Sequence, residues 1–138
     1  MAETQTQLVL KGVTPYLTVK GAVAAIDFYK KAFGAEEVSR MPDQRDPTKL
    51  MHAHLRINGA DVLMSDDFAG AMEELGGAMP RGVTMHVQVD DAHAWWKRAL
   101  AAGASVKMEL AEQFWGDTYG QLKDPFGHSW SIAMAKKK

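Results

Sequence analysis

The chain of 138 residues carries 16 basic and 17 acidic side chains, is 46% hydrophobic and contains no cysteine. This composition is typical of an ordinary soluble globular domain, and a formal net charge of −1 argues against a nucleic-acid partner. The lack of cysteine excludes disulfides, thiolate metal sites and a cysteine nucleophile. The first 11 residues contain no basic-then-apolar block, and no apolar run approaches the roughly 18 residues of a membrane span. We therefore expect a cytoplasmic protein with no membrane partner.

The first predicted elements are a short strand over residues 16–19 and an amphipathic helix that ends at Gly34. Apolar residues recur in this helix at i, i+3, i+4 and i+7, and they are Ala22, Ala25, Ile26, Tyr29 and Phe33. A weaker strand follows over residues 38–41. Two stronger strands, at 52–57 and 61–65, flank Asn58-Gly59, which is a strong signal for a two-residue hairpin.

The same pattern returns about 70 residues later. Residues 86–89 alternate, Asp90-Asp91 offers an N-cap, and Gly103 ends a second apolar stripe made of Ala92, Trp95, Trp96 and Ala99. A weak strand at 106–110 precedes a hairpin of residues 119–123 and 128–133. The sequence thus predicts an α+β fold of two tandem β-α-β-β-β modules, residues 12–67 and 83–135, joined by a linker at 68–82.

Two motifs carry a resemblance to a known family. Ala25-Ile26-Asp27-Phe28-Tyr29 in the first helix and Trp115-Gly116-Asp117-Thr118-Tyr119-Gly120 followed by Asp124-Pro125-Phe126-Gly127-His128 resemble the vicinal oxygen chelate superfamily of glyoxalases, bleomycin resistance proteins and dioxygenases, and its PhnB-like subgroup. The resemblance implies a single domain over residues 1–138 with a half-open, cup-like mixed sheet and the helices outside. It also implies a homodimer and a small-molecule site inside the cup.

Strand alternation separates an apolar, helix-facing set of residues from a polar set that would line the cup. We expect the ligand-binding residues to come from this polar set and from an aromatic residue before the glycine-rich stretch, namely Tyr16, His52, His54, His86, Gln88, Trp115 and Ser131. Two other interpretations stay open. The strand residues could face solvent or a dimer partner, and Trp115 could pack in the core.

The resemblance also implies where metal-dependent relatives hold their ion. Those positions fall on Thr14, Thr84, Ser131 and Leu63, or on Met64 if the register slips by one. Divalent metals favour imidazole and carboxylate ligands, and these residues supply neither. We therefore expect no metal cofactor. The alternative is a displaced zinc, nickel or iron site formed by His52, His54 and His86.

Two function classes follow from these residues. The first is a metal-free protein that binds a small molecule and sequesters a metabolite or drug. The alternative is an enzyme of lyase, isomerase or dioxygenase type, which uses the displaced metal site or general acid–base chemistry by Tyr16, His54 and His86. The sequence assigns no catalytic residue. Adjacent acidic pairs, Asp66-Asp67 among them, are interpreted as surface residues.

Overall fold

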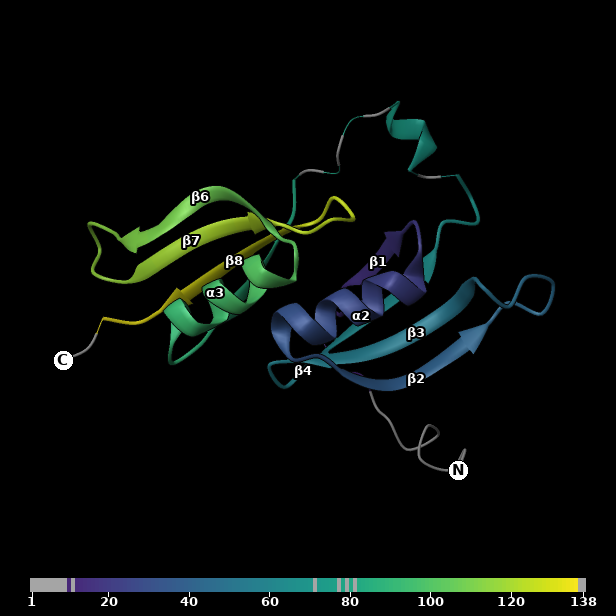
Figure 1. The fold of residues 1–138 in the computed structure, drawn as a ribbon, viewed down its shortest axis with the longest axis horizontal. Helices are drawn as coiled ribbons and strands as arrows, with labels where there is room; N and C mark the ends of the chain where they lie inside the picture. The colour runs from purple at the N-terminus through teal and green to yellow at the C-terminus, as the bar shows by residue number, and fades with distance from the viewer. Residues whose placement is uncertain are drawn as a thin grey trace. The chain divides into compact units, whose positions relative to one another are not determined.

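The computed structural model describes residue 10 and residues 12–70, 72–76, 78, 80 and 82–136. Its elements run in the order β1 (Tyr16–Val19), α2 (Ala22–Phe33), β2 (Glu36–Pro42), β3 (Leu50–Ile57), β4 (Ala60–Asp66), a 3₁₀ turn (Glu73–Leu75), β5 (Thr84–Gln88), α3 (Ala92–Ala102), β6 (Ser105–Glu112), β7 (Thr118–Lys123) and β8 (Ser129–Met134) (Figure 1). The predicted β-α-β-β-β order is confirmed in both halves. Strands β2 and β6 extend beyond the weak strands predicted at 38–41 and 106–110.

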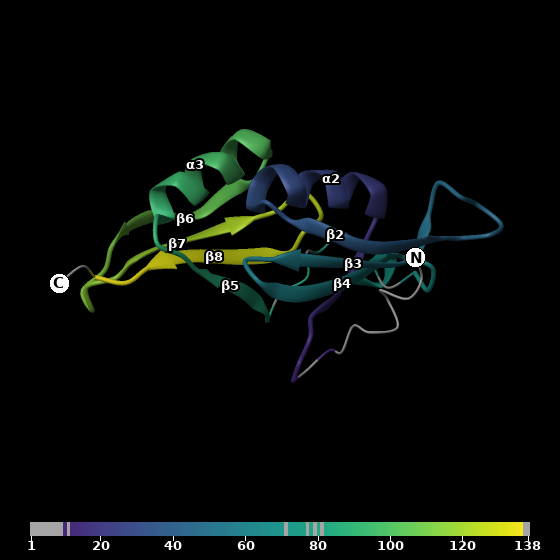
Figure 2. The same cartoon turned by 90° about the horizontal axis from the view of Figure 1, so that it is seen from below.

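Two four-stranded mixed sheets form, in the orders β1-β4-β3-β2 and β5-β8-β7-β6. In each sheet one pair of strands is parallel, β1 with β4 and β5 with β8, and the other pairs are antiparallel. The chain divides into two compact units, one holding the first sheet and the other the second. Each sheet has a helix on one of its faces, α2 on the first and α3 on the second (Figure 2). The predicted α+β class with two modules is confirmed.

Helix α2 is stabilised by its apolar stripe and by caps at both ends. Ala25, Ile26 and Tyr29 are fully buried. Gly34 adopts the left-handed conformation (φ 65°) and its backbone N–H bonds the carbonyl of Lys30, as a C-terminal glycine does. The first turn has no side-chain cap of its own, because the N-cap position is also a left-handed glycine.

Asp66, at the end of β4, caps α2 instead. Its Oδ1 accepts the backbone N–H groups of Gly21 at 2.8 Å and Ala22 at 3.1 Å, while its Oδ2 accepts that of Leu50 at 2.8 Å. Asp66 is only 6% exposed. The interpretation of this acid as a surface residue was wrong, because three backbone N–H groups, two of them at the start of α2, surround its carboxylate.

Helix α3 begins as the sequence predicts. The Asp91 carboxylate accepts the backbone N–H of Ala94 at 3.1 Å, and Gly103 follows the last turn with φ 120°. The helix approaches β7 closely at Gly120. A Cβ atom built there would lie 2.6 Å from Cζ3 of Trp96 and 2.8 Å from Cα of Leu110, so only glycine fits beneath the indole ring.

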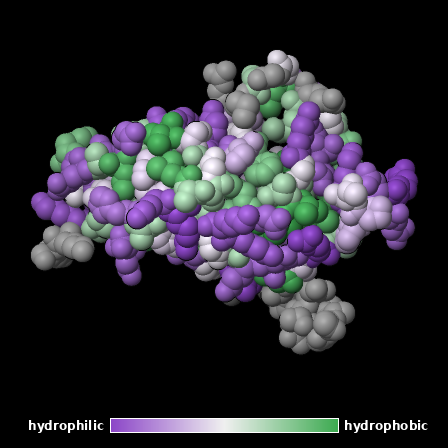
Figure 3. All heavy atoms as spheres, in the orientation of Figure 1, coloured by the Kyte–Doolittle hydropathy of each residue, from purple (hydrophilic) through white to green (hydrophobic). Residues whose placement is uncertain are grey.

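The hairpin at Asn58-Gly59 fixes the register of the first sheet. Both residues have positive φ, 51° and 81°, as a type I′ turn requires. The two-residue loop predicted at Asn58-Gly59 is confirmed, and it pairs Ile57 with Ala60, Leu55 with Val62 and His54 with Leu63. Hydrophilic and hydrophobic residues are interspersed over the face of the chain seen in Figure 3. No helix in the described part of the chain is long and apolar enough to cross a membrane.

Candidate functional site

The predicted site residues on strands lie on the face of each sheet opposite its own helix, which we call the open face. Alternation puts Leu55 and Met64 on the helix side, where both are fully buried, and their neighbours on the open face. In the first sheet this face carries Tyr16, Thr18, His52, His54, Arg56, Asp61, Leu63 and Ser65. In the second sheet it carries Thr84, His86, Gln88, Tyr119, Gln121, Lys123, Ser129 and Ser131.

Tyr16 and His52 form a pair on the first open face. The tyrosine Oη lies 3.1 Å from Nδ1 of His52, and the two ring centroids are 5.7 Å apart. Partial burial, together with the nearby imidazole of His54, lowers the pKa of His52 from its ordinary value. The uncharged imidazole is therefore favoured, and its Nδ1 can accept a hydrogen bond from the tyrosine hydroxyl.

His54 is held by an acid on the next strand. Its Nε2 donates to Oδ1 of Asp61 at 2.8 Å, and its ring is only 5% exposed. The Asp61 carboxylate also accepts a hydrogen bond from Nε of Arg56 at 3.3 Å, and Nη2 of Arg56 lies 3.3 Å from the same oxygen. The hydrogen bond from His54, reinforced by the charge of Arg56, holds the pKa of Asp61 below its usual range. Asp61 thus fixes both the orientation and the tautomer of His54.

Three predicted residues meet on the second open face. His86 Nδ1 lies 2.7 Å from the Ser131 hydroxyl, and His86 Nε2 lies 2.8 Å from Oε1 of Gln88. Because an amide oxygen only accepts, Nε2 carries the proton and Nδ1 accepts from Ser131. Ser131 is 1% exposed. This buried serine and the glutamine hold the exposed imidazole in one orientation.

Aromatic rings extend this group toward the turn between β6 and β7. Tyr119 stacks on His86 with ring centroids 6.1 Å apart and an interplanar angle of 20°. Trp115 meets Tyr119 edge-on at 6.0 Å, and Phe114 meets Trp115 at 5.0 Å. Phe114 is 97% and Trp115 51% exposed, so neither ring packs in a core. We call His86, Gln88, Ser131, Tyr119 and Trp115 the His86 cluster.

Sequence reasoning missed two members of these groups, Tyr119 and Asp61. Tyr119 was assigned to a strand but to no site, although it alternates with helix-facing residues of β7. Asp61 was taken only as the first residue of a strand. The signal for both was their position on the open face, because cross-strand neighbours on one face contact each other.

The positions that the family uses for a metal do not fit one in this chain. Thr84 and Ser131 are not cross-strand partners, because Thr84 is paired with Ser129 and Ser131 is paired with His86. The Ser131 hydroxyl is engaged by His86, and a neutral hydroxyl is a poor ligand for zinc, nickel or iron. Among the residues that the structure describes, no group of three or more histidines and acids is arranged to hold a metal ion. His52 and His54 already bond Tyr16 and Asp61.

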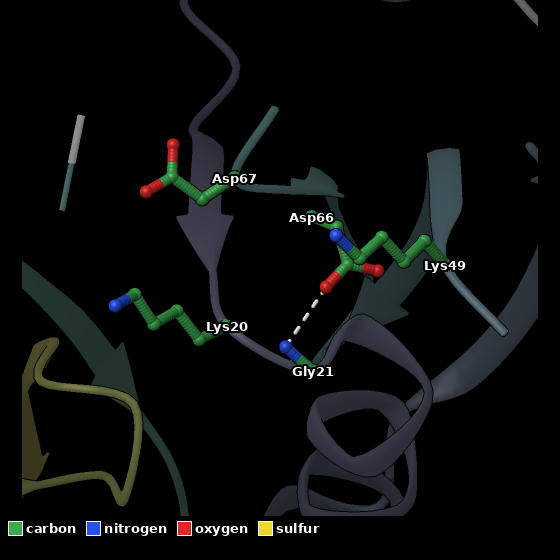
Figure 4. A pocket seen from close by; sticks show the side chains of 5 residues that line it. All are labelled: Lys20, Gly21, Lys49, Asp66 and Asp67. Carbon is green, nitrogen blue, oxygen red and sulfur yellow. Dashed lines mark hydrogen bonds between the residues drawn. The ribbon is translucent and has the colours of Figure 1, made fainter. Parts of the chain in front are cut away.

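A cavity of about 350 Å³ lies at the start of α2 (Figure 4). Lys20, Gly21, Lys49, Asp66 and Asp67 line it. The carboxylate of Asp66 is occupied by backbone N–H groups, and the two lysines are matched by two acids. The lysines and acids that line this cavity are equal in number, and Asp66 caps the helix.

Comparison with known proteins agrees with the fold and with the resemblance. The family model of the glyoxalase/bleomycin resistance protein/dioxygenase superfamily matches residues 9–132. An uncharacterized protein of Mycobacterium tuberculosis, Rv0887c, is 46% identical over 129 residues, covering 88% of this chain and 73% of the relative. A PhnB protein from Bacillus cereus has a similar structure, with a TM-score of 0.73 at 19% identity over 91% of this chain and 100% of that one. The fosfomycin resistance protein FosX of Listeria monocytogenes has a TM-score of 0.69 at 14% identity over 94% and 96%. The chain belongs to the glyoxalase/bleomycin resistance protein/dioxygenase superfamily.

Proposed function

We propose that the protein binds a small metabolite or drug at the His86 cluster and sequesters it. The observation that carries this proposal is the pairing of a fixed imidazole with exposed aromatic rings. His86 is held by Ser131 and Gln88 at 2.7 and 2.8 Å, and Trp115 stays half exposed beside Tyr119. Small-molecule sites combine aromatic walls with a few oriented polar groups. Because Ser131 and Gln88 already orient His86, little conformational entropy is lost when a ligand packs against its ring.

The relatives support a small-molecule ligand. The structural neighbour from Listeria is described as a fosfomycin resistance protein, and the family description includes bleomycin resistance. The proposal also includes a cytoplasmic homodimer with no nucleic-acid or membrane partner. Sedimentation at micromolar concentration tests the dimer, and a single species near 15.2 kDa would reject it.

A screen of a metabolite and drug library by amide chemical shifts tests the binding. We expect ligands to shift the amides of residues 86, 88 and 119. H86Q should weaken their binding about tenfold or more, since it removes one oriented group worth about 1.4 kcal/mol. The matched control is H93Q, which changes an exposed histidine on α3 and should leave binding unchanged. Ligands that bind the H86Q variant as tightly as the parent would reject this site.

A second candidate function is general acid–base chemistry at His54. The favouring observation is the 2.8 Å bond to Asp61, which leaves Nδ1 of a buried imidazole as the proton acceptor. If the protein converts a library compound, the H54Q variant should no longer convert it. The D61N variant should shift the pH profile of the conversion. Turnover that survives H54Q would exclude this candidate while leaving the binding function intact.

A further inference from the structure

The two open faces differ in the residue that lies next to a basic side chain. In the first sheet, the pair next to His54 and Leu63 on the same face is Arg56 with Asp61. In the second sheet, the pair next to Gln121 and Ser131 on the same face is Lys123 with Ser129. The same place in the two modules is thus occupied by a cation with an acid in one, and by a cation with a serine in the other.

Arg56 has its counter-ion within the protein, because Asp61 Oδ1 lies 3.3 Å from its guanidinium. On the second open face, Lys107 reaches over from the bulged strand β6, and its Nζ donates to the Ser129 hydroxyl at 3.3 Å. Within the described part of the chain, neither Lys107 nor Lys123 pairs with a carboxylate. Ser129 is 5% exposed, and Thr84 lies beside it on β5.

From this difference we infer that the ligand of the second open face is a small organic anion, whose carboxylate is bound by Lys107, Lys123 and Ser129. This inference rests on the proposed function and specifies the class of ligand. The Lys107 ammonium meets the Ser129 hydroxyl, and Lys123 is the cross-strand neighbour of Ser129, where the other module has an acid. A ligand carboxylate therefore takes the place of the missing counter-ion. Hydrogen bonds between charged partners are about twice as strong as neutral ones.

The remainder of the ligand would extend along β7 toward the aromatic rings. Tyr119 is four residues from Lys123 on the same strand, a separation of about 14 Å at 3.4 Å per residue. Gln121 lies between them on the same face and donates to the Tyr119 hydroxyl at 3.0 Å. The site therefore favours an anion attached to an extended body that ends in a ring.

The test compares 4-phenylbutanoate with its uncharged amide, 4-phenylbutanamide, by titration of amide chemical shifts. We expect the carboxylate to bind about tenfold more tightly than the amide and to shift residues 107, 123 and 129. K107M keeps the apolar stem and removes the charge. It should therefore weaken the binding of the carboxylate about fivefold or more without affecting the binding of the amide. S129D installs the acid of the first module and should abolish the preference. K97M, at an exposed position of α3, is the control and should change neither affinity.

Equal affinity of the two probes, or an unchanged preference in K107M, would overturn the inference. K107M changes an exposed residue of an edge strand, so the test stands even if S129D fails to fold. If acetate binds as tightly as 4-phenylbutanoate and K97M weakens both, the attraction is diffuse and the inference also fails. The proposed function is tested separately, by the binding of library ligands to the parent and to the H86Q variant. If 4-phenylbutanoate and its amide bind the His86 cluster equally well, the inference of an anionic ligand fails but the proposed binding function does not.

Discussion

The two sheets carry a tyrosine and a histidine at matching places, but the two residues are exchanged. In the first sheet Tyr16 is on β1 and His52 on β3, whereas in the second His86 is on β5 and Tyr119 on β7. The shared fold determines where a ring pair can form. The neighbours determine what the pair can do. Leu63 lies next to Tyr16, but Ser131 lies next to His86 and orients it.

The starts of the two helices give the largest expected difference between the modules, because one helix is capped by a distant residue and the other by its own N-cap. D66A removes the acceptor of three backbone N–H groups, two of them at the start of α2 and the third on β3, and should lower the free energy of unfolding by about 3 kcal/mol. D91A removes one local cap bond and should cost about 1 kcal/mol. Urea unfolding followed by circular dichroism measures both. Equal losses would show that the cap of α2 from β4 is no more important than an ordinary N-cap.

The packing of helix on sheet is the second comparison. G120A should cost about 2 kcal/mol, because the added methyl overlaps Trp96 and the backbone at Leu110. The first module has Ile26 and Ala53 at the corresponding helix and strand positions, and both are fully buried. The double variant W96I/G120A reproduces that combination. Thermal unfolding should show that it is more stable than the sum of its two single changes implies. If the stability losses of the two single variants simply add in the double variant, the smaller helix residue does not make room for the added methyl group.

Much of this fold follows from short-range patterns. The spacing of Ala22, Ile26 and Tyr29 predicted α2, and Asn58-Gly59 predicted the register that puts His54 opposite Leu63. The contacts that make the site depend on distant segments instead. No local pattern shows that Lys107 reaches Ser129, because a β-bulge redirects the strand there.

The same limit explains the error at Asp66 and the oversight at Asp61. In the sequence, Asp66 looks like a surface residue and Asp61 only like the first residue of a strand. Asp66 receives its donors from residues 16 and 45 positions away, and Asp61 receives the imidazole of a residue seven positions away across the hairpin. Donors brought by the tertiary fold, rather than the acid's own neighbours, decide what a carboxylate binds: they bury Asp66, whereas Asp61 stays partly exposed.

Removal of Asp61, the counter-ion of Arg56, should lower stability less than the changes at Asp66 and Gly120. D61A leaves a buried imidazole N–H without its acceptor and should cost about 1–2 kcal/mol at pH 7, while S129A at the matching place should cost about 0.5 kcal/mol. Because the pKa of Asp61 is lowered in the folded protein, its contribution is present above about pH 4 and is lost as the pH falls below that. Denaturation of both variants at pH 7 and pH 3 measures this. A cost of D61A that does not change with pH would contradict the role of the ionised carboxylate.

The smallest expected effect concerns His52. Its pKa is lowered by burial and then by His54, so the uncharged form is favoured in the folded protein, and the stability that it contributes is lost as the pH falls through about 6.5. Titration by NMR should show His52 gaining its proton below pH 6.5. H54Q should raise this pKa only in part, since burial remains. A complete return to the ordinary value would assign the whole shift to His54.

The repetition of one module within a single polypeptide has a consequence for how its halves could diverge. Two separate copies of a module, assembled as a homodimer, would have to carry the same residue at every matching place. Joined in one chain, each copy mutates independently. One half of this protein can therefore have an acid, Asp61, beside its cation while the other has Ser129 at the matching place. Duplication followed by fusion turns a symmetric arrangement into one in which each half can evolve its own chemistry.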